Sequence, residues 1–329
     1  MTERPISWDE IFEKLTEKQN LSDLQINWAM SQILDGLANN DQIKNFLLLL
    51  KAKGEKPSEV RALVDVMYQR GIAINIAERA VDIVGTGGDG ASTINISTTA
   101  AIITTAAGAR TIKHGNRAAS SKSGAADLLE ALGIDISLGA EQIQECVRRI
   151  GIGFAFAPIF HPAMKNAASA RRELETPTVF NILGPLANPA KPKAVAIGVA
   201  RAELLELVAT VLAERGCEGF IFRGDDGLDE ISLSTTSTIF QINNGEITRH
   251  IFDPSEIGLE RVGIEELRGG TPSENAEITR AIFAGKGGPY RQSVLLNAAS
   301  AIAAFKGDFH LGLTQQLANG YTLAKQAVD

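Results

Sequence analysis

The stretch Ala80-Val-Asp-Ile-Val-Gly-Thr-Gly-Gly-Asp-Gly90 joins a short apolar, β-branched segment to a glycine-rich loop. The apolar part, residues 80–84, predicts a buried strand, and the residues from Asn95 onward predict a helix. Glycines between a strand and a helix let an anion approach the backbone N–H groups, and the helix N-terminus attracts negative charge. The stretch therefore predicts an α/β fold with a phosphate-binding loop, although the glycines alone could also form a plain turn.

Strands and helices alternate after this stretch. Further apolar segments predict strands at 111–113, 153–157, 194–197 and 219–222, and helices are predicted at 95–108, 123–133, 140–151 and 202–216. Such alternation is typical of a mostly parallel sheet flanked by helices. Asn243-Asn-Gly245 predicts a hairpin, and hence an antiparallel part of the sheet. Helices are predicted again at 273–285 and 290–306.

The first 71 residues predict helices only. Ser7-x-x-Glu10 and Ser22-x-x-Gln25 are capping boxes, each of which precedes an amphipathic segment. Asn40 and Asp41 can cap a third helix, and Pro57-Ser58 begins a fourth. We therefore expect a small N-terminal α-helical domain at 1–75 and a large α/β domain at 76–329.

The composition excludes some kinds of partner. A net charge of -7 disfavours long nucleic acid, which needs a basic surface. The sequence lacks a run of about 18 apolar residues, so no membrane span is expected. The two cysteines, Cys146 and Cys217, are far apart and have no metal-binding or redox spacing, so free thiols in a reducing cytoplasm are expected.

The glycine loop has the spacing of a dinucleotide fingerprint, Gly85-x-Gly87-x-x-Gly90. That fingerprint needs an acidic residue about 20 positions later, but no Asp or Glu occurs between Asp89 and Asp127. The loop also lacks the Gly-Lys-Ser/Thr ending of a nucleotide P-loop. Asp89 at about 4 Å from a bare phosphate would cost several kcal/mol, so it should face sugar hydroxyls or metal-bound water. The loop thus favours a sugar phosphate or diphosphate with Mg²⁺.

Three more segments suit that ligand. Thr93-Ile-Asn-Ile-Ser-Thr98 lies at a predicted helix start, where its polar residues can hold phosphate or simply cap the helix. The segment Lys113–Gly124 is basic and rich in serine, which suits a polyanion, although a run of charges is more often a solvated face. Asp229 and Glu230 follow a predicted strand and suit Mg²⁺, unless they belong to a solvated acidic loop.

Six motifs occur in the order and spacing of one enzyme family. They are 85–89, 95–98, 113–124, Phe160-His-Pro-Ala-Met-Lys165, Val179-Phe-Asn-Ile-Leu-Gly-Pro-Leu-Ala-Asn-Pro189 and Asp226-Gly-Leu-Asp-Glu230. On these motifs the chain resembles the anthranilate phosphoribosyltransferase family from about Ile11 to Ala327. Gly269-Gly-x-Pro-x-Glu-Asn275 and Leu295-Leu-Asn-Ala-Ala299 extend the likeness.

The resemblance implies a fold of the nucleoside phosphorylase type, in which a segment near 162–190 packs on the small helical domain. It implies a homodimer formed through that domain, and the cysteines predict a cytoplasmic location. The implied reaction uses Mg²⁺ and transfers the phosphoribosyl group of phosphoribosyl diphosphate to anthranilate, in tryptophan biosynthesis.

The resemblance also implies the site residues. Mg²⁺ would be held by Ser97, Asp229 and Glu230. Anthranilate would contact Gly85, Asn116 and Arg171, with His114, His161 and Pro185 along its path. No catalytic base is assigned, because the aromatic amine is already neutral at pH 7 and the catalysis is mostly electrostatic. Phosphoribosyl diphosphate would be bound by Gly85, Gly88, Asp89, Thr93, Asn95, Ile96, Ser97, Thr98, Lys113, His114, Gly115, Asn116, Arg117, Ala118, Ala119, Ser120, Ser121 and Ala125.

Three positions depart from the family pattern. Ile94 replaces a common Phe, Ala125 replaces a frequent Ser, and Glu175-Thr-Pro177-Thr replaces the usual Gly-x-Arg-Thr. The last change adds a carboxylate and removes a basic residue near the acceptor. In addition, Arg171 could pair with Glu173 or Glu175 of its own segment instead of a substrate.

Other functions stay open. One is a pyrimidine-nucleoside phosphorylase of the same fold, which would not need paired metal-binding carboxylates. Another is a diverged member of the family with a different acceptor or with nucleic-acid binding.

Overall fold

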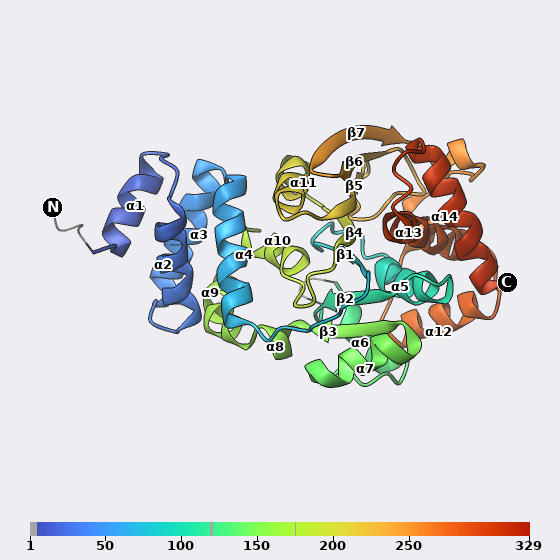
Figure 1. The fold of residues 1–329 in the computed structure, drawn as a ribbon, viewed down its shortest axis with the longest axis horizontal. Coiled ribbons are helices and arrows are strands. Elements are labelled where there is room, and N and C mark those ends of the chain that lie inside the picture. The colour runs from blue at the N-terminus through green and yellow to red at the C-terminus, as the bar shows by residue number, and fades with distance from the viewer. Residues whose placement is uncertain (1–4, 119–120, 175) are drawn as a thin grey trace.

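The computed structural model describes residues 5–118, 121–174 and 176–329. Helices from the N-terminal part of the chain lie at one end of the molecule, and an α/β part lies at the other (Figure 1). The α/β part holds a mostly parallel sheet flanked by helices, which confirms the predicted fold class. Not one of the described helices is long and apolar enough to cross a membrane.

Four helices form the N-terminal part: α1 (Trp8–Thr16), α2 (Asp23–Leu34), α3 (Asn40–Lys53) and α4 (Pro57–Arg70). Ser7 and Ser22 cap the first two as predicted, whereas Asn39 rather than Asn40 caps the third. Their apolar faces meet in one core, because short amphipathic helices are stable only when that face is covered.

The sheet has seven strands in the order β3-β2-β1-β4-β5-β6-β7. The first five in sequence pair in parallel, and the last two form the antiparallel hairpin predicted at Asn244-Gly245, where both residues have positive φ. The order reverses between β1 and β4, and ligands of open α/β sheets bind at such a reversal, outside the carboxyl ends of the strands. The strands are β1 (Val81–Gly85), β2 (Thr111–Gly115), β3 (Ile152–Phe156), β4 (Ala194–Gly198), β5 (Glu218–Gly224), β6 (Ser237–Asn243) and β7 (Glu246–Phe252).

Helices cover both faces of the sheet (Figure 1). One face shares a core with α5 (Ile96–Ala106), α13 (Pro289–Lys306) and α14 (Leu313–Val328). The other face shares a core with α10 (Phe180–Leu186) and α11 (Leu205–Glu214), and this core continues into α1–α4. The remaining elements are α6 (Ala125–Ala131), α7 (Ala140–Ile150), α8 (Ala157–Phe160), α12 (Pro272–Phe283), and the 3-10 helices η2 (Ala202–Leu204), η3 (Pro254–Ile257) and η4 (Ile264–Leu267).

A later segment returns to the N-terminal helices. In η1 (Pro162–Ala167), Asn166 Nδ2 donates to Leu34 O at 2.8 Å. In α9 (Ala168–Glu173), Glu173 pairs with Lys44 of α3 at 2.8 Å. The domain boundaries at 1–75 and 76–329, with a segment near 162–190 packing on the helical domain, stay a prediction.

Candidate active site

The loop after β1 lies tightly against the segment after β5. Gly87 N donates to Asp229 Oδ2 at 2.6 Å. A Cβ on Gly85 would lie 2.1 Å from Asp229 Oδ2, and a Cβ on Gly198 of the neighbouring β4 would lie 1.7 Å from Asp229 O. Gly87 itself has φ +72°, which favours glycine. Gly85 and Gly198 are therefore required by the close approach of Asp229, and Gly87 is required by the conformation of the turn.

The N-terminus of α5 faces the same acidic pair. Ser97 N donates to Glu230 Oε1 at 3.0 Å, and a carboxylate is favourable at this end of a helix. Lys113 Nζ from β2 donates to Ser97 Oγ at 3.2 Å and to Ile83 O. Segments that are distant in the sequence thus meet at the carboxyl ends of β1, β2 and β5. The donor side, as we name it, comprises the glycine loop 85–90, the segment 93–98, Lys113, Asp229 and Glu230.

The donor side holds more acidic groups than its lysine balances. Asp229, Glu230 and Lys113 are 8%, 7% and 3% exposed. Burial, together with the charge of Asp89, raises the pKa of Asp229 to about 7, and burial, together with the charge of Asp229, raises the pKa of Glu230 to about 8. Burial also lowers the pKa of Lys113. Neighbouring buried carboxylates are stable only when they are protonated or neutralised by a cation.

The other predicted donor residues of the first two motifs lie around this centre. Asp89 Oδ1 accepts a hydrogen bond from Ala91 N at 3.1 Å. Gly88 is exposed, whereas Ile96 and Thr98 are buried. Thr93 forms an isolated β-bridge with Arg268. Asn95 is hydrogen-bonded through its side chain to Ser123 at 2.9 Å.

The charged residues of the basic segment after β2 make contacts in two different places. Lys113 belongs to the donor side, but the exposed Arg117 pairs with Asp127, at 3.0 Å, and with Glu130, both on α6. Its guanidinium also lies over the ring of Phe156. Gly115 is the last residue of β2, and Ala125 is the first residue of α6. Between them, Asn116 and Ser121 are exposed, and Ala118 donates its N–H to Asp127 Oδ2 at 3.0 Å. Ala119 and Ser120 lie outside the described residues.

The residues predicted to line the anthranilate path meet on the other side of the sheet. The rings of His114 and His161 lie 5.2 Å apart at 62°. His114 Nδ1 lies 2.9 Å from Gly184 O, and His161 Nε2 lies 2.8 Å from Ala187 O. Pro185 is buried in α10 between these two carbonyls. Burial lowers the pKa of His114 to about 3 and also lowers that of His161, so both rings are neutral near pH 7.

Arg171, the predicted ligand of the anthranilate carboxylate, lies on the exposed surface of α9. Within the described residues its guanidinium forms no ion pair, and Glu173 pairs with Lys44 instead. Glu175, the other partner considered from the sequence, lies outside the described residues. We refer to His114, His161, Pro185 and Arg171 together as the acceptor side.

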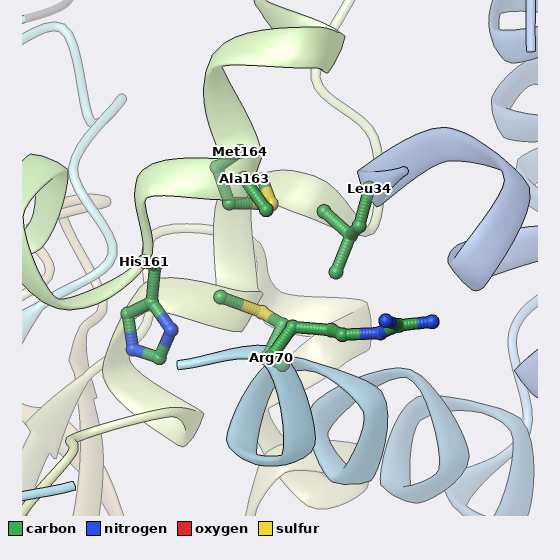
Figure 2. Close-up of a pocket in the computed structure, with 6 residues that line it drawn as sticks. Leu34, Arg70, His161, Ala163 and Met164 are labelled. Atoms are coloured by element: carbon green, nitrogen blue, oxygen red, sulfur yellow. The ribbon is translucent and has the colours of Figure 1, made fainter. Parts of the chain in front are cut away.

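Two hollows adjoin these residues. One is lined by the glycine loop, by Pro177, by Asn181 and Ile182 of α10, and by residues after β4. The other is a shallow hollow where α2, α4 and η1 meet. Figure 2 shows His161 and Leu34 on opposite sides of this second hollow, with Ala163 and Met164 of η1 above it and Arg70 of α4 below it. His161 therefore lies at the junction of the acceptor side and the helical part.

Comparison with known proteins assigns both parts of the chain to one family. Residues 77–329 match a family model described as glycosyl transferase family, a/b domain, and residues 9–71 match one described as glycosyl transferase family, helical bundle domain. The anthranilate phosphoribosyltransferase of Rhodococcus jostii is 49% identical over 323 residues, covering 98% of this chain and 89% of that protein. The chain belongs to the anthranilate phosphoribosyltransferase family.

Solved structures of anthranilate phosphoribosyltransferases have the same fold. The crystal structure of the Thermus thermophilus protein is 35% identical and aligns with a TM-score of 0.88 over 97% of this chain and 95% of that one. The Saccharomyces cerevisiae protein in complex with PRPP and Mg is 28% identical, with a TM-score of 0.88 over 98% of this chain and 93% of that one. The likeness therefore extends over the helical and the α/β parts together.

The donor side of this family member fits Mg²⁺ through its charge rather than through a closed set of protein ligands. No group of three or more His, Cys, Asp or Glu side chains among the described residues could hold a metal. Asp229 and Glu230 are buried with raised pKa values, so a divalent cation beside them would offset their charge. Mg²⁺ usually binds one or two carboxylates and takes its other ligands from phosphates and water. The residues present fit that pattern.

Three buried polar residues of the site were not assigned a role from the sequence. Asp82 of β1 is 1% exposed and accepts hydrogen bonds from His114 N at 3.4 Å and from Asn188 Nδ2 at 2.8 Å. Burial raises the pKa of Asp82 to about 6. An acidic residue inside an apolar strand is a visible signal of such a role. The third residue, Asn275, donates to Asn95 Oδ1 at 2.9 Å, and only its place in a family motif marked it.

Proposed function

We propose that the protein transfers the 5-phosphoribosyl group of phosphoribosyl diphosphate to the amine of anthranilate, giving N-(5-phosphoribosyl)anthranilate and diphosphate, in tryptophan biosynthesis. The observation that carries this proposal is the convergence of the glycine loop, the α5 N-terminus, Lys113 and the Asp229–Glu230 pair. Together they bring a loop, a helix N-terminus and a lysine side chain, all suited to phosphate, beside two carboxylates suited to Mg²⁺. Membership of the family supplies the identity of the acceptor.

The donor side would stabilise the charge that develops when the bond from ribose C1 to diphosphate breaks. Negative charge grows on the leaving diphosphate, where the loop N–H groups, the α5 N-terminus and the Lys113 ammonium can bind it. Ser97, Asp229 and Glu230 would hold Mg²⁺, which supplies further positive charge to the diphosphate when bound. Asp89 would face the ribose hydroxyls, since a carboxylate beside phosphate is unfavourable. The other donor contacts are those predicted from the sequence.

The acceptor side would orient anthranilate without a proton-transfer group. Arg171 would bind the anthranilate carboxylate through a charged hydrogen bond, and Gly85 and Asn116 would contact the ring. The neutral His114 and His161 and the buried Pro185 would line the path. The amine attacks C1 in its neutral form, so we assign no general base.

We propose in addition that two copies of the chain associate through the N-terminal helices, in the cytoplasm. Leu24 and Leu37 are 72% and 67% exposed on this part, and an association through these helices would cover such side chains. The free thiols of Cys146 and Cys217 support a reducing compartment.

A fluorescence assay tests the reaction. The protein is mixed with Mg²⁺, phosphoribosyl diphosphate and micromolar anthranilate, and loss of anthranilate fluorescence is followed. We expect a loss that requires all three components. A parallel sample holds uridine or thymidine with inorganic phosphate. No fluorescence loss in the first sample would overturn the proposal, and phosphorolysis in the second would replace it with a nucleoside phosphorylase.

A further inference from the structure

Asn95 stands at the N-cap of α5, yet its side chain does not cap that helix. An Asn at this position commonly accepts a hydrogen bond from an N–H of the first turn. In the part of the chain that the structure describes, Asn95 forms no such cap bond. Its Oδ1 instead accepts hydrogen bonds from Ser123 Oγ and Asn275 Nδ2, both at 2.9 Å, and its Nδ2 donates to Ser123 O at 2.9 Å. The amide of Asn95 is therefore directed away from the helix end.

Other contacts hold the side chain of Asn275 in place for its hydrogen bond to Asn95. It lies on α12, is 2% exposed, and accepts a hydrogen bond from Gly270 N at 2.8 Å through Oδ1 while its Nδ2 donates to Asn95. A Cβ on Gly269 would lie 2.7 Å from Thr93 O and 2.9 Å from Asn275 Oδ1. The backbone at Gly269 thus lies tightly between the donor motif and α12, where only glycine fits.

Backbone hydrogen bonds extend this support along the donor motif. Gly269 N donates to Ser92 O at 2.8 Å, and Ile94 N donates to Leu267 O at 3.0 Å. These hydrogen bonds hold the segment 267–275 against residues 92–95. The side chain of Asn275 connects this segment to Asn95, the N-cap residue of α5.

We propose that Asn275 is a positioning residue for phosphoribosyl diphosphate. Its hydrogen bond to Asn95 holds the amide of Asn95 on Ser123, which keeps that side chain off the first turn of α5. The first-turn N–H groups then remain directed at Glu230 and at the donor phosphates, and the end of the basic segment is fixed at Ser123. This inference rests on the proposed function, since it takes the ligand of the donor side from it.

The same two helices provide a matched control one turn further along. Thr279 of α12 is also 2% exposed, and its Oγ1 lies 3.1 Å from Thr99 Oγ1 of α5. Asn275 and Thr279 are four residues apart, as are Asn95 and Thr99, so the two bonds are successive links between the same elements. Only the first link reaches the side chain of the cap residue, whereas Thr99 Oγ1 donates to the main-chain O of Asn95 at 3.0 Å. Loss of the second tests the effect of weakened α5–α12 contact alone.

The experiment compares N275A, N275D and T279V with the unmodified protein. N275D keeps an oxygen for Gly270 N but places a second oxygen against Asn95 Oδ1, whereas N275A removes both contacts. We expect the KM for phosphoribosyl diphosphate to rise about tenfold in N275A and at least as much in N275D, with kcat changed less than threefold. The KM for anthranilate should stay within twofold at saturating donor, and T279V should stay within twofold in every constant.

Equilibrium dialysis of labelled phosphoribosyl diphosphate with Mg²⁺, without anthranilate, gives a second readout, and thermal melting shows which variants fold. The dialysis should show the same tenfold weakening in N275A. Donor affinity within twofold of the unmodified protein in folded N275A, or an equal loss in T279V, would overturn the inference. If N275D does not fold, the donor affinity of N275A alone decides whether the inference holds. If the unmodified protein binds the donor but does not use anthranilate, the proposed function fails while the dialysis still decides the role of Asn275.

Discussion

Distant segments of the chain hold the donor side together, whereas the acceptor side is attached mainly to main-chain carbonyls of one segment. On the donor side, Gly87 is bonded to Asp229 and Ser97 to Glu230, contacts that join residues 142 and 133 positions apart. On the acceptor side, the rings of His114 and His161 contact carbonyls in or just after α10. The first arrangement concentrates charge, and the second brings two uncharged imidazole rings together.

This difference separates the tasks of the two sides. Charge develops on the diphosphate in the transition state, so the groups of the donor side should govern turnover. The acceptor side carries a single cation, Arg171, on a helix that packs against the N-terminal part. Its groups should govern which acceptor binds and how tightly. Variants on the two sides should therefore change different kinetic constants.

The largest effect is expected from the double variant D229N with E230Q. It removes both carboxylates assigned to Mg²⁺ while keeping side chains of nearly the same shape. Loss of such electrostatic stabilisation costs about 10²- to 10³-fold in kcat, and the remaining activity should no longer depend on Mg²⁺ concentration. Initial rates of fluorescence loss over a series of Mg²⁺ concentrations measure both effects.

The control for this variant is D225N, in the same loop. Asp225 is exposed and bonded to Thr236 and Thr238, so its replacement should leave kcat and the Mg²⁺ dependence within twofold. An unchanged rate and an unchanged Mg²⁺ dependence in the double variant would mean that the metal assignment is wrong.

The donor side was largely predictable because its chemistry lies in short motifs. The glycine loop and the segment 93–98 are recognisable from glycine and hydroxyl residues around a predicted strand and helix. Asp229 and Glu230 are adjacent and follow a predicted strand. A parallel sheet then places these motifs together, since the carboxyl ends of its strands meet at one edge.

The sequence could not predict contacts between side chains that are far apart in the chain and share no local pattern. Asn275 reaches Asn95 across 180 positions, and neither periodicity nor spacing encodes that meeting. The family resemblance predicts that Arg117 binds phosphate, and no pattern in the sequence predicts its ion pairs with Asp127 and Glu130 of the next helix. The helix α14 was also missed, since its N-cap is Gly312, without a side-chain cap to mark its start.

A smaller and more selective effect is expected from R171A. A hydrogen bond to a charged group contributes about 1.5–3 kcal/mol, so the KM for anthranilate should rise roughly 10- to 100-fold. The KM for phosphoribosyl diphosphate should stay within twofold. R172A, the exposed neighbour on α9, provides the control and should change neither constant. A rise confined to the donor KM would contradict the role of Arg171.

The smallest expected effect concerns stability on the acceptor side. His114 has its pKa lowered to about 3, first by burial and then by His161, whereas an unfolded histidine binds its proton near pH 6.5. Between these values the unfolded chain holds more protons than the folded one, so stability falls as the pH decreases from 6.5 toward 3. The contribution is on the order of 1 kcal/mol for each pH unit in that range.

Urea unfolding of H114Q at pH 7 and pH 5 tests this contribution. The contact of residue 114 with Asp82 is made by the backbone N–H, which the substitution keeps. The stability advantage of the unmodified protein over H114Q should therefore shrink by about 1–2 kcal/mol between pH 7 and pH 5. H310Q replaces an exposed histidine, and its difference from the unmodified protein should stay constant. Equal differences for H114Q at both pH values would show that the acceptor side does not hold this ring neutral, and the contrast with the charged donor side would then fail.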